Sequence, residues 1–104
     1  MIDKFERDGK VAVLISTDYG AGWYTWNTEL GEQLLFDPEI VLLVLEKKSD
    51  KEIHDFCSKK YPTAYCGGAD DLEVEWVDKG EHFHIQEYDG AETLLLIKDL
   101  EHIA

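Results

Sequence analysis

Long apolar segments are absent from this chain of 104 residues. The longest unbroken apolar run, residues 40–45, is far too short to cross a bilayer as a helix. The first ten residues carry charges throughout and lack the apolar stretch of a signal peptide. Cysteine is also scarce, with only Cys57 and Cys66, so we expect a cytoplasmic chain with reduced thiols. A disulfide between these two residues is compatible with the sequence but is not required.

Basic residues are few. Lysine and arginine number 10 against 23 acids, which gives a formal net charge of −13. The imbalance is strongest in residues 69–101, where eleven acids meet two bases. Such a surface repels nucleic acid and anionic membranes, so direct binding to either is not expected. The acidity fits plain solubility, a basic protein partner or mimicry of a nucleic-acid backbone.

Recognisable catalytic and phosphate-binding motifs are missing as well. The glycines at 20 and 22 begin a G-x-G-x-x-G pattern that fails at Thr25, and no G-x-x-x-x-G-K-[ST] sequence is present. No Lys or Arg occurs between Val11 and Lys47, so a phosphate group near this segment would meet only backbone N–H groups. No serine lies in a nucleophile-elbow pattern. We therefore expect no catalytic residues and no cofactor.

The most distinctive stretch that is present is residues 18–27, D-Y-G-A-G-W-Y-T-W-N, with four aromatic residues and two glycines. A loop of this kind either packs on the core or presents a recognition surface, and its two tryptophans suit both roles. A second loop, residues 67–71, is expected nearby and ends in two carboxylates. The candidate ligand- or partner-binding residues are Asp18, Tyr19, Trp23, Tyr24, Trp26, Asn27, Asp70 and Asp71.

Local signals predict a strand on each side of a helical region. Residues 10–17 are apolar on both faces and predict a buried strand. Residues 63–66 are expected to form a short strand parallel to it, because a helical crossover joins parallel neighbours. If so, the aromatic loop and residues 67–71 lie at the same end of the sheet.

Three helices are expected between these strands. A short helix capped at residue 27 or 28 would run to about residue 36. Asp37-Pro38-Glu39 predicts the start of a second, deeply buried helix that continues to about residue 48. Ser49 and Glu52 have the spacing of a capping box and predict a third helix to about residue 60.

The C-terminal third alternates between apolar and polar residues and predicts a three-stranded antiparallel meander with turns at residues 79–80 and 89–90. The second turn places Tyr88 opposite Ala91 and Ile85 opposite Leu94. The chain is therefore expected to be one α+β domain over residues 1–104. Its single-layer mixed sheet would have four to five strands, the N-terminal strand and this meander included, packed on two or three helices.

One face of the meander would carry Glu73, Glu75, His82 and His84, with Glu75 opposite His84. Two imidazoles and two carboxylates can bind Zn²⁺ or another divalent ion if they converge. On a flat sheet face they diverge, which favours a His–Glu pair without metal. The same face mixes apolar and polar residues, which makes it the expected surface for a homodimer.

Three segments resemble small proteins encoded by bacteriophage and prophage genomes. They are D-Y-G-A-G-W-x-T-W-N at 18–27, L-F-D-P-E-I-V at 35–41 and G-G-A-D-D-L at 67–72. The likeness covers most of the chain and carries no established activity. It implies a small accessory protein, located in the host cytoplasm, that acts by binding a host protein or a small host molecule.

Three functions follow from these features. The leading expectation is a small acidic, non-enzymatic phage-type accessory or inhibitor protein that binds a host protein with a basic surface through its aromatic loop. The second is a small-molecule binding protein, in which the aromatic loop stacks on a nucleotide-like ligand and Asp18, Asp70 or Asp71 holds its sugar hydroxyls. The third is a small metal-dependent hydrolase built on the two Glu and two His residues of the meander.

Overall fold

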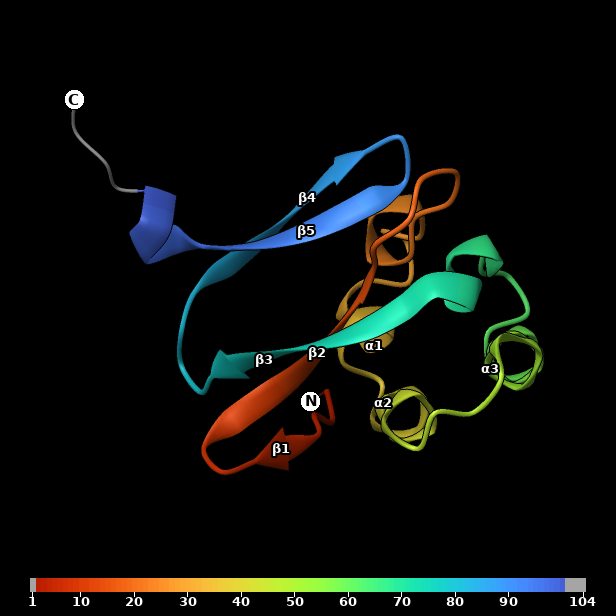
Figure 1. Cartoon of the computed structure of the whole chain (residues 1–104), viewed down its shortest axis with the longest axis horizontal. Coiled ribbons are helices and arrows are strands. Elements are labelled where there is room, and N and C mark those ends of the chain that lie inside the picture. Colours follow the sequence, from red (N-terminus) through yellow and green to blue (C-terminus); the bar gives the residue numbers. More distant parts are fainter. Residues whose placement is uncertain (1, 101–104) are drawn as a thin grey trace.

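The computed structural model describes residues 2–100. This part of the chain contains five strands, three α-helices and three short 3-10 helices, joined by loops. The arrangement is α+β, as the sequence predicts (Figure 1). In chain order the elements are β1 (Glu6–Arg7), β2 (Lys10–Ser16), η1 (Tyr24–Trp26), α1 (Glu32–Phe36), α2 (Pro38–Leu45), α3 (Asp50–Lys60), η2 (Gly67–Asp71), β3 (Leu72–Asp78), β4 (Phe83–Tyr88), β5 (Ala91–Leu96) and η3 (Ile97–Leu100).

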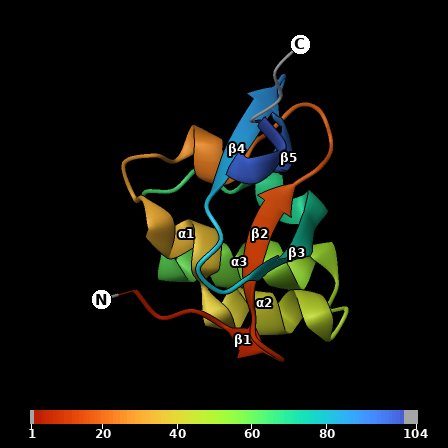
Figure 2. The same cartoon turned by 90° about the vertical axis from the view of Figure 1, so that its left-hand side faces the viewer.

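β2 is the centre of the fold, and its residues are apolar because both of its faces are covered. It lies between β1 and β3 in an antiparallel sheet. Ala12 and Leu14 belong to a core formed with the helices, whereas Val13 and Ile15 belong to a second core closed by α1, β4 and β5. These four side chains are at most 2% exposed. Figures 1 and 2 show α2 and α3 on one side of β2 and the β4–β5 hairpin on the other. The predicted buried strand is confirmed.

Capping by Asp37 starts α2 where the sequence predicts. Its Oδ1 accepts hydrogen bonds from the backbone N–H groups of Glu39 (2.9 Å) and Ile40 (3.0 Å). Its other oxygen accepts a hydrogen bond from the Tyr61 hydroxyl and pairs with the Lys60 ammonium at 2.8 Å. Burial, followed by the contact with Asp37, raises the pKa of Tyr61 above its usual range. One carboxylate thus joins the start of α2 to the end of α3.

The remaining helix boundaries follow local backbone chemistry. α3 begins after Ser49, whose Oγ accepts a hydrogen bond from the Glu52 N–H at 3.2 Å, so the capping box is confirmed. α1 starts later than expected because Gly31 has a φ of +66°, which interrupts the helical backbone. α2 ends before Lys47, which has a φ of +57°. α2 is also not deeply buried along its length, since Leu42 is 46% exposed.

The predicted strand at residues 63–66 is wrong, and with it the parallel pairing and the mixed sheet. These residues form a loop in which the backbone N–H and C=O of Tyr65 are bonded to the Asn27 side chain, at 2.7 and 2.9 Å. A strand would need these groups for its ladder. The chain then enters β3, which runs antiparallel to β2 with Leu72 opposite Ser16.

The predicted meander is half right. β4 and β5 form the expected hairpin, with Tyr88 opposite Ala91 and Ile85 opposite Leu94. Asp89 and Gly90 both have positive φ, 49° and 91°, as a tight two-residue turn requires. β3 and β4 are not paired, because residues 79–82 lead the chain from one sheet to the other and the N–H of Lys79 donates to the carbonyl of Gly9 at 3.0 Å.

Two sheets therefore replace the single sheet, and the composite face expected for a homodimer is not formed. The three-stranded sheet has the order β1-β2-β3, and the two-stranded sheet consists of β4 and β5. Cys57 and Cys66 are unbridged and buried in the helical core, and burial raises the pKa of the Cys57 thiol. Within residues 2–100, no helix has the length and apolar character needed to span a membrane.

Candidate binding surface

The aromatic loop at residues 18–27 is clamped between η2 and the β4–β5 turn. A Cβ on Gly68 would lie 2.4 Å from the carbonyl oxygen of Gly22, and a Cβ on Gly90 would lie 2.5 Å from the nitrogen of Ala21. Glycine is thus required at both positions, because the backbones touch there. The N–H of Gly20 also donates to the carbonyl of Asp89 at 2.6 Å. The loop and residues 67–71 are neighbours as expected, but they meet because β2 ends beside the start of antiparallel β3.

Glu92 holds this loop in place. Its side chain is buried, with the residue only 3% exposed, and it reaches from β5 into the backbone of the loop. One oxygen accepts a hydrogen bond from the Ser16 N–H at 2.9 Å. The other accepts from the N–H groups of Trp23 and Thr25, both at 2.9 Å, and from the Thr25 hydroxyl at 2.7 Å. Four donors thus replace the water that this carboxylate loses on burial.

Trp23 and Asn27, two of the predicted binding residues, are buried inside the protein. Trp23 is fully buried in the helical core, and its Nε1 donates to the carbonyl of Leu34 at 2.7 Å. Asn27 is 7% exposed and uses its amide on the backbones of Trp23 and Tyr65. Both side chains therefore hold the loop from inside, and Asn27 also lines the hollow beside Trp26 and Tyr65.

Four exposed aromatic side chains lie in the clamped loop or beside it, and we name them the aromatic surface: Tyr19, Trp26, Tyr65 and Tyr88. Tyr19 and Tyr88 are 73% and 71% exposed and meet edge to face with ring centroids 6.3 Å apart. Trp26 and Tyr65 are 39% and 53% exposed, with centroids 5.5 Å apart. The Trp26 Nε1 donates to Glu87 Oε2 at 2.8 Å, which fixes its orientation.

Sequence reasoning found Tyr19 and Trp26 but missed Tyr65, Tyr88 and the clamp Glu92. A signal existed for two of them. Tyr88 directly precedes the Asp89-Gly90 turn that the sequence predicts. The predicted hairpin register also places Glu92 on the inward face with Leu94, where an acid needs a partner. Tyr65 has no such signal, since its position depends on Asn27, distant in sequence.

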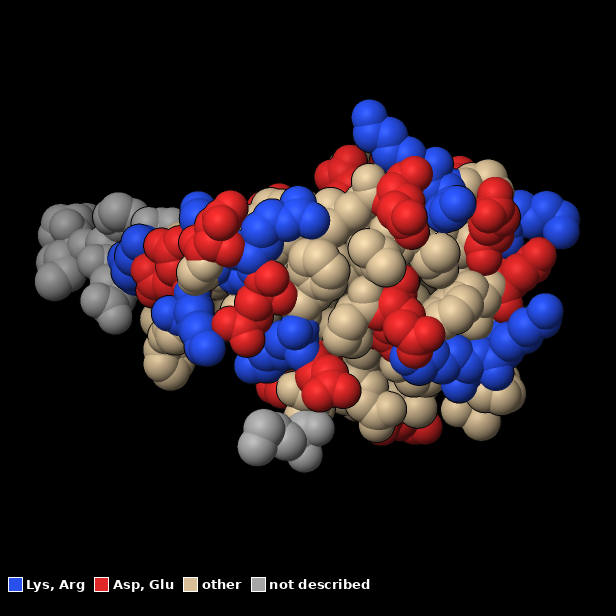
Figure 3. All heavy atoms as spheres, turned by 90° about the horizontal axis from the view of Figure 1, so that it is seen from below, with Lys and Arg blue, Asp and Glu red and all other residues tan. Residues whose placement is uncertain are grey.

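The segments that form the aromatic surface carry charge of one sign, and Lys51 of α3 lines a hollow with Asp70 at their border. Residues 18–27, 65–72 and 87–91 contain five acids and no Lys or Arg. Asp18 and Asp70 are exposed, and Asp71 is half-buried beside Asp18. The pKa of Asp71 is raised, first by partial burial and then by its contact with Asp18. By contrast, the face seen from the side of β1 and α2 carries Lys and Arg side chains interleaved with acids (Figure 3).

The four metal-ligand candidates do not come together. Glu73 and Glu75 lie on β3, with Glu75 opposite Val13, whereas His84 lies on β4 opposite Leu95 and His82 just precedes β4. The expected Glu75–His84 pairing is wrong because the two strands belong to different sheets. Within residues 2–100, no group of three or more His, Cys, Asp or Glu side chains is placed to hold a metal ion.

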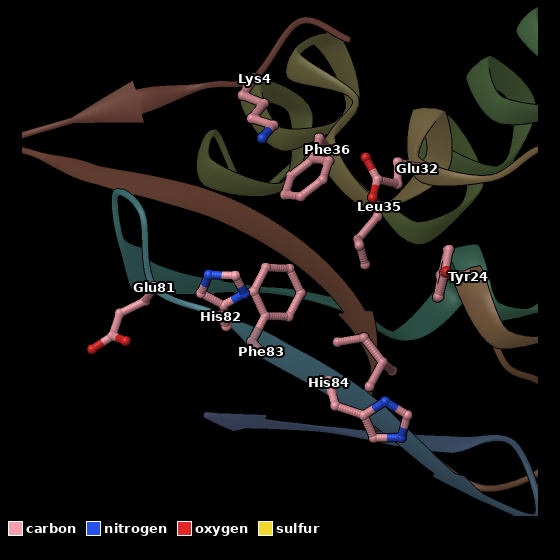
Figure 4. A pocket seen from close by; sticks show the side chains of 10 residues that line it. Lys4, Tyr24, Glu32, Leu35, Phe36, Glu81, His82, Phe83 and His84 are labelled. Atoms are coloured by element: carbon pink, nitrogen blue, oxygen red, sulfur yellow. The ribbon is translucent and has the colours of Figure 1, made fainter. Parts of the chain in front are cut away.

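Another groove is lined by none of the four residues of the aromatic surface. It has a volume of about 500 Å³ and runs between α1 and the start of β4 (Figure 4). Tyr24, the last of the aromatic-loop candidates, is half-buried and lines it together with both histidines.

Comparison with protein-family models, with curated proteins and with solved structures gives no match.

Replacing Glu92 by glutamine is expected to lower the free energy of unfolding by about 2–4 kcal/mol, because the new amide NH₂ would face donors instead of accepting from them. Urea denaturation measures this change. Glu73→Gln, at an exposed position on β3, is the matched control and should change stability by less than about 0.5 kcal/mol. Equal stability of the two variants would contradict the clamp.

Replacing Asp71 by asparagine is expected to raise the melting temperature near neutral pH. The pKa of Asp71 is raised in the folded protein, so the folded state binds this proton more tightly than the unfolded chain does. Its ionised form therefore destabilises the fold above that pKa, and the penalty disappears as the pH falls through it. Melting curves over a pH series should show the gain of Asp71→Asn shrinking in acid, and a gain that stays the same at every pH would contradict this prediction.

Proposed function

We propose that this chain is a non-enzymatic binding protein that recognises a host protein with a basic surface, as a phage-type accessory or inhibitor protein does. The observation that carries the proposal is the aromatic surface, four exposed rings packed in two pairs. Isolated exposed aromatics are common in soluble proteins, but a group of four around one rigid loop marks an interaction site.

The rigidity of this surface favours binding. The Glu92 clamp fixes the backbone beneath Trp26, and Glu87 fixes its indole ring through a hydrogen bond of 2.8 Å. Tyr and Trp side chains bury much area and dominate the energetics of protein interfaces. When such residues are already ordered in the free protein, association loses less conformational entropy.

The charge around the surface indicates the kind of partner. Five acids and no bases in the three segments that form this end disfavour an acidic partner and attract a basic one. The overall charge of −13 adds to this attraction at long range. Association should accordingly slow as added salt screens these charges.

A metal-dependent hydrolase is not proposed, because its four candidate ligands lie on separate sheets. A nucleotide-like small molecule remains the second candidate, and one feature favours it. Trp26, Thr63 and Tyr65 line a hollow of about 260 Å³, where a planar base can stack on an aromatic ring. Its lining contains Glu29 but no Lys or Arg, which favours a nucleoside over a phosphorylated ligand.

For the protein partner, the double variant Tyr19→Ala/Tyr88→Ala should lose about 30-fold in affinity, the effect of removing a hot spot of about 2 kcal/mol. Both side chains are more than two-thirds exposed, so the melting temperature should change little. Affinity purification from host lysate identifies the partner, and titration of the purified partner measures the loss and its salt dependence. Leu42→Ala, an exposed apolar position on α2, is the matched control. Equal binding by both variants would overturn the proposal.

For the nucleoside, a thermal-shift titration with the four ribonucleosides and their monophosphates is the direct test. We expect a nucleoside to raise the melting temperature of the wild type but not of Trp26→Ala. The monophosphate should act more weakly, because the hollow offers its charge no cation. The absence of a shift with every compound would remove this candidate.

A further inference from the structure

We propose a second docking site, separate from the aromatic surface, at which an extended, basic segment of a partner protein adds as a new strand to the free edge of β4. The site is the groove of about 500 Å³ between α1 and β4 (Figure 4). Four consecutive residues, 82–85, line one wall of this groove. Because side chains alternate along a strand, consecutive residues line one groove only where it runs along the backbone edge.

The hydrogen-bond pattern of the hairpin shows which backbone groups face this groove. The N–H of Ile97 donates to the carbonyl of His82 at 2.9 Å, so His82 and Ile97 are a hydrogen-bonded pair. In an antiparallel ladder such pairs alternate, and His84 is therefore also bonded to β5. The N–H and C=O groups of Phe83 and Ile85 point away from β5, toward the groove.

No other strand uses this edge in the described part of the chain, where β4 pairs with β5 alone. The backbone groups of Phe83 and Ile85 are therefore positioned to bond an incoming strand. This is the arrangement by which exposed sheet edges bind extended peptides.

Phe83 is half-buried and offers an apolar contact to a side chain of that strand, whereas Leu35 and Phe36 are each 4% exposed and form the floor of the groove. Phe36 and Phe83 meet edge to face, with ring centroids 6.1 Å apart, and Leu35 lies beside them on α1 (Figure 4). Backbone pairing supplies affinity in this mode of recognition, and apolar pockets of this kind supply selectivity.

The negative charge of the protein favours a basic segment over a second copy of the chain as the partner in this groove. Glu32 is exposed on the α1 wall, and the Lys4 ammonium group lies over the Phe36 ring of the same wall at 4.6 Å. On the β4 side, Glu81 pairs with Lys98 at 2.9 Å, and the side chains of His82 and His84 are exposed. The protein as a whole carries −13, so a second copy of the chain would be repelled from this edge. A segment in which apolar residues alternate with Lys or Arg is attracted to it and matches the period of the groove.

Amide exchange and chemical shifts in ¹⁵N-labelled protein test the proposal. The probe is a peptide of alternating lysine and valine with blocked ends, which is extended and cationic. We expect it to slow exchange of the Phe83 and Ile85 amides at least about tenfold, as new strand hydrogen bonds do. The same peptide N-methylated at every residue carries methyl groups along both of its edges, so it cannot pair with β4 and should give no protection.

Matched variants locate the site. Glu32→Lys should weaken peptide binding about tenfold, whereas Glu29→Lys makes the same charge change outside this groove and should leave binding unchanged. Tyr19→Ala/Tyr88→Ala should also bind the peptide normally, so failure of this site and failure of the aromatic surface are distinguishable.

Three outcomes would overturn the proposal. The first is an absence of changes at Phe83 and Ile85 on adding the peptide. The second is equal binding of the N-methylated peptide, since that binding would not use the strand edge. The third is a dimeric mass for the free protein in sedimentation, together with protection of these two amides, which would assign the edge to a second copy of the chain.

Discussion

The hydrogen bonds made by the buried carboxylate of Glu92 are the interactions on which the rest of the structure depends. An acid is costly to bury unless donors replace its water, and here three backbone N–H groups and one hydroxyl do so. These donors come from the end of β2 and from the aromatic loop, while the acid comes from β5. The contact therefore joins the two sheets and the loop at one point. Without it, the loop backbone would need other partners for its N–H groups, and the β4–β5 hairpin would lose a link to β2.

The clamp explains how one short loop supplies both core and surface. Trp23 turns inward and is fully buried, while Trp26, three residues later, lies 39% exposed beside Tyr65. This division requires close backbone contact on both sides of the loop, which the glycines at 68 and 90 permit. The sequence of the loop alone does not determine which aromatic ring is buried, because burial depends on segments that are distant along the chain. The burial of one ring and the exposure of another are consequences of the same clamp.

Local chemistry made much of the fold predictable. The caps at Asp37 and Ser49 and the Asp89-Gly90 turn each act within a few residues, and each is where the sequence places it. The errors concern distant pairing. Lys79-Gly80 forms the predicted tight turn, closed by the N–H of Glu81 on the carbonyl of Asp78 at 3.0 Å, yet β3 pairs with β2 and not with β4. Whether an alternating segment pairs with its neighbour in sequence or with a distant strand is decided by burial across the whole domain, which a local pattern does not contain.

The candidate site was predictable only in part for the same reason. A binding surface collects residues from several segments, and here the loop provides Tyr19 and Trp26 while Tyr65 and Tyr88 come from elsewhere. The distribution of charge over the molecule adds information that no single segment contains. Eight of the ten bases lie in residues 1–10 and 47–60, and none lies in the segments around the aromatic surface. The segments around the aromatic surface lack Lys and Arg, whereas the face of β1 and α2 is mixed (Figure 3), so the proposed basic partner would be attracted most strongly to the aromatic end. In the proposed function, electrostatic orientation and aromatic anchoring would therefore act at the same place.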